Sequence, residues 1–380
     1  MMNTQTTDKS AEDVLLPLAI TLELTHRCPL ACPYCSNPVE LLARDTELPE
    51  STWREVIDQA AELGALQVHF TGGEPVLHPG LVGLVAHVRE LNLYSNLITS
   101  GIGLRRQKLD ALVAAGLDHL QLSIQDSTAQ GTDYISGRRG SFARKLEVAS
   151  WCRDTGVSFT LNAVVHGRNM ANLGDMIQLA VDMGVHRLEI AHVQYHGWAL
   201  RNRAALMPTQ EQVLAADALV REASARLAGQ LVIVYVAPDY YSESPKPCMG
   251  GWGRRMMTIA PDGRAMPCHA ASSIPGMTFP RVDEHPLRWI WTSSEAFMRY
   301  RGTAWMPEPC ASCELRERDW GGCRCQALAL AGDAGVTDPT CSRSPLHDHM
   351  RALAQAESQA PAPAFVYRRA KRGGRDDSAI

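Results

Sequence analysis

The sequence lacks any apolar run long enough to span a bilayer, and its first ten residues lack the basic region, apolar core and cleavage site of an export signal. It also lacks a strong charge of either sign, because its formal net charge is -4. Nothing in the composition therefore indicates a nucleic-acid or anionic-membrane partner. We expect a cytoplasmic protein with no membrane and no nucleic acid among its partners.

The length and the cysteine content narrow the class of protein further. A chain of 380 residues predicts two or three domains. Its 11 cysteines are better explained as metal ligands than as disulfides, because the cytoplasm keeps thiols reduced. Three of them lie at 28–35, seven lie between 248 and 341, and Cys152 stands alone on a predicted helix as a core residue. This distribution predicts an early metal site and a late metal-rich module.

Strand-like apolar runs alternate with amphipathic helix-like segments through the first 236 residues. The predicted strands are residues 18–24, 67–70, 95–99, 119–124, 158–165, 187–193 and finally 231–236. The predicted helices are residues 50–63, 80–91, 104–115, 142–155, 172–183 and 210–228. Most of them end at a residue that can close a helix in the left-handed conformation, namely Gly64, Asn92, Gly116, Gly156, Gly184 or Gly229. Six consecutive β/α units predict an α/β fold with a parallel sheet, as a partial barrel or a doubly wound sheet.

The character of the chain changes after about residue 237, where prolines and glycines interrupt any helix. Residues 255–268 predict a β-hairpin with a Pro-Asp-Gly turn. A helix-like segment at 281–302 is expected to pack this module onto the first domain. The basic run at 368–375 is expected to be disordered, with a binding role as the alternative. We divide the chain into a mobile arm at 1–14, an α/β domain at 15–236, a cysteine-rich module at 237–345 and a tail at 346–380.

Three thiols, Cys28, Cys32 and Cys35, follow the first predicted strand within eight residues. A loop that leaves a strand can fold around an inorganic centre and aim three such side chains inward. A zinc ion would require four ligands and a redox pair only two. Three thiolates suit an iron-sulfur cluster that leaves one iron open for a substrate. On spacing alone, three unrelated buried or reactive cysteines remain the alternative.

A second candidate site, Gly72, Gly73, Glu74 and Pro75, directly follows the second predicted strand. Two glycines allow the backbone to approach a ligand closely, and the proline fixes the turn. Backbone N–H and C=O groups at such a turn can hold an amino acid moiety. Taken alone, an ordinary strand-to-helix turn explains this motif at least as well.

The C-x3-C-x2-C loop, the Gly-Gly-Glu-Pro loop and the β/α units together resemble the radical S-adenosylmethionine superfamily, over roughly residues 16–236. The resemblance implies a partial (β/α)6 barrel. It also implies a 4Fe-4S cluster on Cys28, Cys32 and Cys35, whose open iron binds S-adenosylmethionine next to the glycine loop. One electron from the cluster then cleaves the cofactor, and the resulting radical abstracts a hydrogen atom from the substrate.

Polar residues near the strand ends are further candidates for contacts with this cofactor. Ser123 and Gln125 belong to the end of the fourth strand and point the same way in its two-residue period. The resemblance leads us to expect Arg144, on the next helix, at the cofactor carboxylate, and Ser100 and Asn162 at similar strand-end contacts. A polar residue that merely caps a strand end is an equally good explanation for each of the five.

The seven late cysteines resemble the SPASM extension of peptide-modifying radical enzymes, which binds two auxiliary iron-sulfur clusters. One departure from the family motif is Asp319, which stands where the family has a cysteine five residues beyond its C-x2-C pair. Family topology implies two ligand groups. They are Cys310, Cys313, Asp319 and Cys341 for one cluster, and Cys248, Cys268, Cys323 and Cys325 for the other.

Asp319 is the natural eighth ligand, because two four-ligand clusters need eight and the module has only seven cysteines. A carboxylate is a harder ligand than a thiolate, so it should alter the reduction potential or make that iron more exchangeable. The alternative is a surface carboxylate beside Arg318, with an open iron in the cluster. A zinc ribbon would also explain the C-x2-C pair, but it does not explain the early triplet.

The C-x2-C-x5-Asp-x3-C pattern, residues 123–127 and the chain length most resemble the radical enzymes that cyclise a peptide in pyrroloquinoline quinone biosynthesis. This resemblance implies a carbon-carbon bond between a glutamate and a tyrosine side chain of the precursor peptide PqqA. It implies the peptide chaperone PqqD and an electron donor such as flavodoxin as partners, and auxiliary clusters that accept an electron, the Asp319 cluster included. The alternatives are another SPASM peptide maturase, thioether-forming or sulfatase-maturating, and a zinc-stabilised binding protein without catalysis.

Overall fold

The computed structural model describes residues 16–368. Its centre is a nine-stranded sheet in the order β7-β6-β5-β4-β3-β2-β1-β8-β9. Neighbouring strands from β7 to β8 are all parallel, and β9 runs antiparallel to β8. The strands are β1 (Ala19–Thr25), β2 (Gln67–Gly72), β3 (Tyr94–Thr99), β4 (His119–Ile124), β5 (Ser158–Val165), β6 (Arg187–His192), β7 (Val232–Val236), β8 (Met256–Ile259) and β9 (Ala265–Met266).

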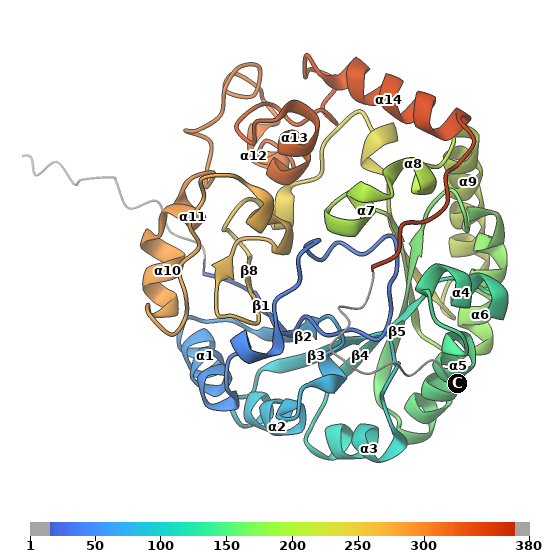
Figure 1. Ribbon diagram of the computed structural model, residues 1–380, viewed down its shortest axis with the longest axis vertical. Helices are drawn as coiled ribbons and strands as arrows, with labels where there is room; N and C mark the ends of the chain where they lie inside the picture. The colour runs from blue at the N-terminus through green and yellow to red at the C-terminus, as the bar shows by residue number, and fades with distance from the viewer. Residues whose placement is uncertain (1–15, 369–380) are drawn as a thin grey trace, which may run out of the picture.

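Helices form an outer ring around the curved sheet (Figure 1). The ring contains α1 (Glu50–Glu62), α2 (Leu81–Glu90), α3 (Arg106–Ala114), α5 (Ser141–Thr155), α6 (Leu173–Asp182) and α9 (Gln210–Arg226). Each of these helices follows one strand and precedes the next. Every crossover therefore returns the chain to the end of the sheet at which the previous strand began, and consecutive strands are parallel neighbours. The predicted α/β fold with a partial barrel is therefore confirmed.

The core lies between the sheet and this ring. On α1, the apolar residues Trp53, Val56, Ile57 and Ala60 recur with the helical period, and all four are fully buried. They face strand residues such as Phe70, which is also fully buried. The same pattern on each ring helix explains why the alternating runs of the sequence fold into two layers.

Helix boundaries agree with the prediction to within a few residues. The residues predicted to end helices all have positive φ angles, from 56° at Asn92 to 96° at Gly116. The prediction missed several short helices that line the open end of the barrel, where period and length are too small to recognise. They are α4 (Ala129–Ser136), α7 (Gly197–Arg201) and α8 (Arg203–Leu206), with 3-10 turns at Arg44–Thr46, Pro75–Leu77, Met170–Asn172, Asp239–Tyr241, Cys248–Gly250 and His269–Ser273.

The cysteine-rich module shares the sheet of the barrel. The predicted β-hairpin is present as β8 and β9, and β8 pairs in parallel with β1, with Met256 opposite Ala19. The sheet thus continues beyond the boundary predicted at 236 and 237. The remaining helices of the module are α10 (Leu287–Ser293), α11 (Glu295–Met298), α12 (Arg316–Asp319) and α13 (Arg324–Ala331). As predicted, 281–302 packs on the first domain, where the Leu287 amide donates to Gln59 Oε1 at 2.8 Å.

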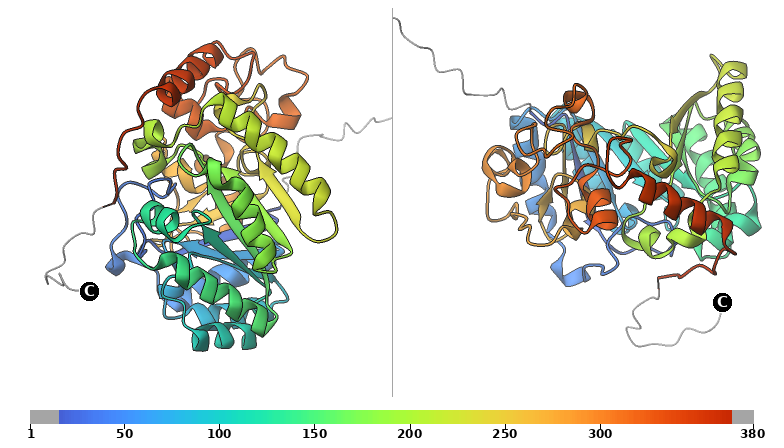
Figure 2. Two further views of the ribbon diagram at one scale, coloured as in Figure 1. Left: turned by 90° about the vertical axis from the view of Figure 1, so that its right-hand side faces the viewer. Right: turned by 90° about the horizontal axis from the view of Figure 1, so that it is seen from above.

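The predicted tail contains a helix, α14 (His347–Gln359), which packs near α8. After it, the chain runs toward the centre of the view in Figure 1, and the side views in Figure 2 show that it stays on the outside of the molecule. The predicted arm at 1–14 and the basic residues after Arg368 lie outside the described residues. Cys152 is fully buried within the main apolar cluster, as predicted.

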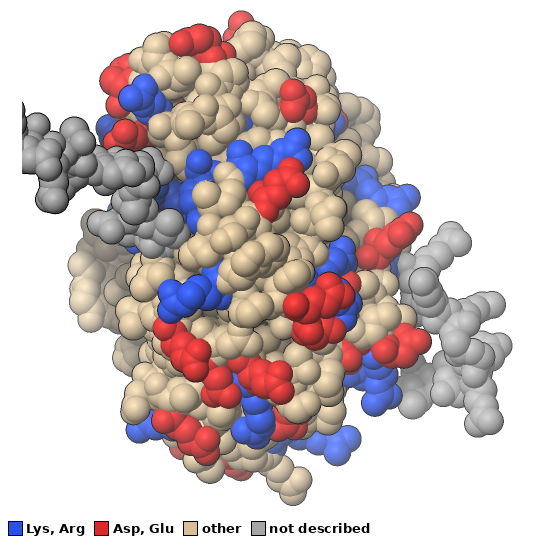
Figure 3. Space-filling view, turned by 90° about the vertical axis from the view of Figure 1, so that its left-hand side faces the viewer, with Lys and Arg blue, Asp and Glu red and all other residues tan. Residues whose placement is uncertain are grey.

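Two surface observations complete the description. No helix within residues 16–368 is both long and apolar enough to cross a membrane. On the face shown in Figure 3, basic and acidic side chains both occur across the surface, so neither sign covers that face alone.

His192, at the end of β6, joins this strand to β7. Its Nε2 lies 2.7 Å from the hydroxyl oxygen of Tyr235, and the residue is 4% exposed. Burial, helped by the charge of Lys246, lowers the pKa of His192 from 6.5 to about 4. The imidazole is therefore neutral in the folded protein at neutral pH.

Replacing Trp53 by alanine should lower the free energy of unfolding by about 3 to 5 kcal/mol, because it removes a fully buried indole from the core. Anaerobic denaturant unfolding measures this change. The matched control is Trp289→Ala, since Trp289 is 43% exposed and its loss should cost less than about 1 kcal/mol. Equal effects of the two substitutions would contradict the position of α1 against the sheet.

His192→Gln should weaken the acid sensitivity of the fold. Below pH 6.5 the unfolded chain protonates this histidine while the folded protein does not until about pH 4, so stability is lost as the pH falls through that window. Between pH 7.5 and 5.5, the wild-type protein should lose about 1 kcal/mol more than the variant. His349→Gln, at an exposed histidine, should leave the pH dependence unchanged. Parallel pH profiles of wild type and His192→Gln would show that the imidazole is not held neutral.

Candidate cluster and cofactor sites

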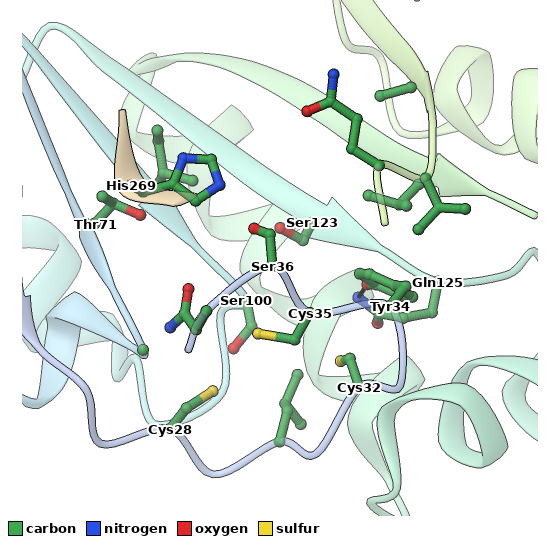
Figure 4. Close-up of a pocket in the computed structure, with 18 of the residues that line it drawn as sticks. Cys28, Cys32, Tyr34, Cys35, Ser36, Thr71, Ser100, Ser123, Gln125 and His269 are labelled. Atoms are coloured by element: carbon green, nitrogen blue, oxygen red, sulfur yellow. Dashed lines mark hydrogen bonds between the residues drawn. The ribbon is translucent and has the colours of Figure 1, made fainter. Parts of the chain in front are cut away.

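A cavity of about 420 Å³ opens at the carboxyl ends of the strands. Cys28, Cys32 and Cys35 all line it, and Figure 4 shows them on one loop with their sulfur atoms near the cavity. Ser100 and Ser123, from the ends of β3 and β4, line it from the sheet. In parallel α/β folds this edge of the sheet is where ligands bind.

Backbone hydrogen bonds set the shape of the thiol loop. The Cys35 amide donates to the Cys32 carbonyl at 3.1 Å, which closes a turn between two of the thiols. The Ala31 amide donates to the Ser136 carbonyl at 2.9 Å, which fixes the loop to the end of α4. The loop therefore holds its thiols in place through its backbone and leaves their sulfur atoms available.

The thiols are poorly solvated. Burial raises the pKa of Cys28 to about 11 and that of Cys32 to about 12, and it raises the pKa of Cys35. The charge of Arg368 opposes this shift at Cys28 and Cys35. Thiolates in such a place require a cationic partner. Three convergent thiols with no fourth thiol among the residues that line the cavity fit a 4Fe-4S cluster with one open iron.

The glycine loop after β2 lies directly against the thiol loop. The Gly73 amide donates to the Thr25 carbonyl at 2.6 Å. A Cβ atom at Gly73 would overlap the Arg27 carbonyl oxygen, and one at Gly72, where φ is 126°, would overlap that of Thr25. Only glycine permits this approach. Both glycines line the cavity.

Glu74 and Pro75 are not among the residues that line the cavity. The Glu74 carboxylate is fully buried and accepts hydrogen bonds from Thr99 Oγ1 at 2.5 Å, from the Ser100 amide at 2.9 Å and from Ser100 Oγ. Pro75 starts a buried 3-10 turn. Glu74 thus acts on the cavity through Ser100, which it orients.

Arg144 lies away from the cavity, which differs from the expectation that it reaches a cofactor carboxylate. Its Nη1 donates to Glu147 Oε2 at 2.6 Å on the outer side of α5. The next residue, Lys145, points inward instead, because one helical residue turns the side chain by about 100°. Lys145 is fully buried and its Nζ donates to the carbonyls of Ser100 and Ser123, at 2.8 Å each. Burial lowers its pKa to about 8.

Of the two remaining strand-end candidates, one lines the cavity and the other does not. Gln125 lines the cavity and its Nε2 donates to the Tyr34 hydroxyl at 2.8 Å. Asn162 is in register between Ser123 and Glu189 across β4, β5 and β6. Glu189 lines the cavity and Asn162 does not.

Sequence reasoning missed several residues that line the cavity, among them Glu189, His192, His269 and Arg368. It also missed Lys145, which does not line the cavity but holds the carbonyls of Ser100 and Ser123. Lys145 could have been recognised, because it continues the buried stripe of Val148, Ala149 and Cys152 on α5. The others depend on contacts between distant segments. No spacing in the sequence indicates them.

Four late thiols gather into one group, which is the set that family topology implies. Hydrogen bonds join Cys248 to Cys268 and Cys323, and Cys323 to Cys325. They raise the pKa of Cys248 and lower those of Cys268 and Cys323, which accept them. His269, whose Nδ1 lies 3.9 Å from Cys268 Sγ, also lines the main cavity. This group is therefore close to the early thiols.

Cys310, Cys313, Asp319 and Cys341 line a second, narrow cavity. Asp319 raises the pKa of Cys310 and of Cys341, although burial is the larger cause for both. Asp319 Oδ1 accepts from the Gly321 amide at 2.9 Å. No three His, Cys, Asp or Glu side chains of residues 16–368 are arranged to hold a single metal ion. A four-iron cluster does not require such an arrangement, because each of its ligands binds a separate iron.

Comparison with known proteins agrees with this architecture. The family model described as Radical SAM superfamily matches residues 22–180, and the model described as iron-sulfur cluster-binding domain, SPASM, matches residues 248–314. Among solved structures, Streptococcus suis SuiB bound to S-adenosylmethionine has a TM-score of 0.72 at 18% identity, over 86% of this chain and 77% of that one. Native anSMEcpe with bound AdoMet has a TM-score of 0.64 at 13% identity, over 90% and 96%. These two similarities concern the fold.

Curated relatives are much closer in sequence. The chain is 56% identical over 356 residues to a PqqA peptide cyclase of Xanthomonas axonopodis pv. citri (strain 306). The aligned residues make up 94% of this chain and 96% of that protein. It is 52% identical over 360 residues to a PqqA peptide cyclase of Bradyrhizobium diazoefficiens, which covers 94% and 95%. The chain therefore belongs to the PqqA peptide cyclase family, a family of radical S-adenosylmethionine enzymes with a SPASM domain.

Proposed function

We propose that this enzyme joins a glutamate side-chain carbon to a tyrosine ring carbon within the precursor peptide PqqA, in pyrroloquinoline quinone biosynthesis. The observation that carries the proposal is the identity of 52% to 56% over 94% of the chain to relatives named PqqA peptide cyclase. The cavity lined by three thiols at the carboxyl ends of the strands supports it. The structure of SuiB bound to the precursor peptide SuiA shares the fold, with a TM-score of 0.71.

The first task of the chain is to hold the radical source. Cys28, Cys32 and Cys35 would hold the 4Fe-4S cluster, and the backbone of Gly72 and Gly73, which line the same cavity, would hold the amino group of S-adenosylmethionine. When bound, the two groups supply a carbon radical that removes a hydrogen atom from the substrate.

Polar groups on the adjacent strand ends position the cofactor. Ser100, Ser123 and Gln125 face the cavity, and two buried charged groups stiffen this wall. Lys145 holds the carbonyls of Ser100 and Ser123 together, while Glu74 fixes the Ser100 hydroxyl and amide. The wall is therefore pre-organised before any ligand binds. Asn162 remains a candidate cofactor contact from its register position, and Arg144 would have to leave its ion pair with Glu147 to become one.

The substrate loses two hydrogens in the proposed reaction. One C–H bond of the glutamate side chain and one of the tyrosine ring are replaced by a single C–C bond. The first hydrogen leaves as an atom, and the second leaves as a proton and an electron. We assign the electron to the auxiliary sites. The group of four late thiols that contains Cys268 lies close to the main cavity, because His269 contacts Cys268 and also lines that cavity.

The auxiliary sites hold two iron-sulfur clusters in this proposal, with Asp319 as the eighth ligand. Cys310, Cys313, Asp319 and Cys341 would hold one of them, which would take part in the electron path. The radical domain spans 15–236 and the auxiliary module 237–345, joined through the common sheet. The enzyme works in the cytoplasm with the chaperone PqqD and a donor such as flavodoxin.

Incubation of the anaerobically prepared enzyme with PqqA peptide, PqqD, S-adenosylmethionine and a reductant should give a peptide lighter by two hydrogens. Cys28→Ala should abolish the product, because a cluster ligand is lost, whereas Cys152→Ala should retain most activity, because Cys152 lies in the core outside all three thiol groups. Mass spectrometry with fragment analysis locates the new bond. Cleavage of S-adenosylmethionine with a peptide of unchanged mass, or a thioether in place of the carbon-carbon bond, would refute the cyclase assignment.

Asp319→Ala should alter the electron paramagnetic resonance signal of one auxiliary cluster, because it removes an iron ligand of distinct hardness. The matched control is Glu317→Ala, an exposed carboxylate on the same short helix, which should leave all signals unchanged. Spectra are compared at equal iron content. Identical signals for wild type and Asp319→Ala would show that this carboxylate is not a ligand.

A further inference from the structure

The chain returns to the thiol loop at its carboxyl end. Residues 362–368, which we call the C-terminal strap, leave the region of α14 and run toward the centre of the view in Figure 1. Arg168 holds the start of the strap, since its Nη2 donates to the carbonyl oxygens of Ala362 at 3.0 Å and Pro363 at 2.9 Å. The strap is thus anchored to the barrel just beyond β5.

One buried side chain joins the strap to the thiol loop. Asn202 is 3% exposed. Its Oδ1 accepts from the Val366 amide at 2.7 Å, and its Nδ2 donates to the carbonyls of Val366 at 3.0 Å and Pro33 at 3.2 Å. Pro33 lies between two of the candidate cluster ligands. The strap and the loop are therefore parts of one hydrogen-bonded unit.

Aromatic packing supports the same unit from the side. Phe365 is 7% exposed and stacks on Tyr134 with ring centroids 5.2 Å apart. The Tyr367 hydroxyl donates to the Tyr134 carbonyl at 2.6 Å. Because Tyr134 belongs to α4, whose Ser136 carbonyl holds Ala31, these contacts bring the strap, α4 and the thiol loop together.

Arg368 ends the strap at the cavity itself. Its Nη2 donates to the Cys28 carbonyl at 3.2 Å and to the Leu30 carbonyl. It is the only lysine or arginine among the described residues that line the cavity of the three thiols. Its guanidinium therefore places a positive charge beside the three buried thiols.

We propose that the C-terminal strap is a positioning element of the radical cluster, and that Arg368 both clamps the thiol loop and sets the reduction potential of the cluster bound there. The inference rests on the proposed role of Cys28, Cys32 and Cys35 as its ligands. It adds Arg368, which lies 333 positions beyond Cys35 in the sequence, to the residues that act on this cluster.

The physical reason is electrostatic and mechanical. A reduced cluster carries one more negative charge than an oxidised one, so a nearby fixed positive charge stabilises the reduced form and raises the reduction potential. Hydrogen bonds from the same guanidinium to the Cys28 and Leu30 carbonyls keep the loop closed around the cluster. Groups that support metal ligands in this way commonly change metal affinity by about tenfold or more when replaced.

The test compares full-length Arg368→Ala, Arg368→Lys and Arg368→Gln, with Arg226→Ala as the control. Arg226 lies at the end of α9, is exposed and pairs with Glu222. No peptide is added. The relevant cluster is identified as the one whose electron paramagnetic resonance signal changes when S-adenosylmethionine is added, and its potential and rate of iron loss to a chelator are measured.

Arg368→Ala should make that potential more negative and speed iron loss about tenfold. Arg368→Lys should restore the potential, because it restores the charge, and Arg368→Gln should not. Arg226→Ala should match wild type. An unchanged reduction potential in Arg368→Ala would overturn the proposal even if iron were lost faster. A strap with a purely structural role would change only how well the iron is retained. Since no peptide is present, failure of the cyclase assignment leaves this result intact, whereas absence of a signal that responds to S-adenosylmethionine would remove the basis of both.

Discussion

The contact between two backbone loops is the constraint on which the site depends. Gly73 and Glu74 donate their amides to the carbonyls of Thr25 and Arg27, at 2.6 Å and 2.7 Å, and no side chain fits between these loops. The loop with the thiols is thereby fixed to the end of β2. Glu74 then extends the connection to β3 through Thr99 and Ser100. The register of β1, β2 and β3 therefore sets the position of the two loops on this side of the cavity.

Local periodicity was sufficient to predict a parallel α/β sheet, because the ring helices and strands carry their own apolar patterns and terminating residues. The choice of a partial barrel over a doubly wound sheet came from the family resemblance. The position of β8 beside β1 could not be predicted, since residues 256–259 pair with a strand more than 200 positions earlier and no local signal encodes that partner. At the site, the thiol groups follow from motif spacing and family resemblance. Arg144 shows the limit of this reasoning. Its neighbour Lys145 reaches the strand ends instead, because the direction of a helical side chain depends on its phase in the helix rather than on proximity in sequence.

The carboxyl end of the chain shows a different limit. Residues 362–368 have no helical or strand period, and their order comes from side chains elsewhere, chiefly Asn202 and Arg168. A segment of this kind is indistinguishable from a flexible tail until its partners are known. Its contacts also add a second support to the loop that carries the thiols, which is held by the glycine loop on one side and by Asn202 and Arg368 on the other.

The two auxiliary groups are not structurally independent, and Asp338 is the reason. This carboxylate is 2% exposed, lines the cavity of Cys310 and Asp319, and accepts the Cys323 amide at 2.6 Å. It also accepts from Gln326 and from the Thr340 amide, both at 2.9 Å. One buried carboxylate therefore connects the loops that carry the two groups. Asp319 and Asp338 line the same cavity, and Asp338 also accepts the amide of Cys323 from the other group of thiols, so the two groups share one hydrogen-bonded support.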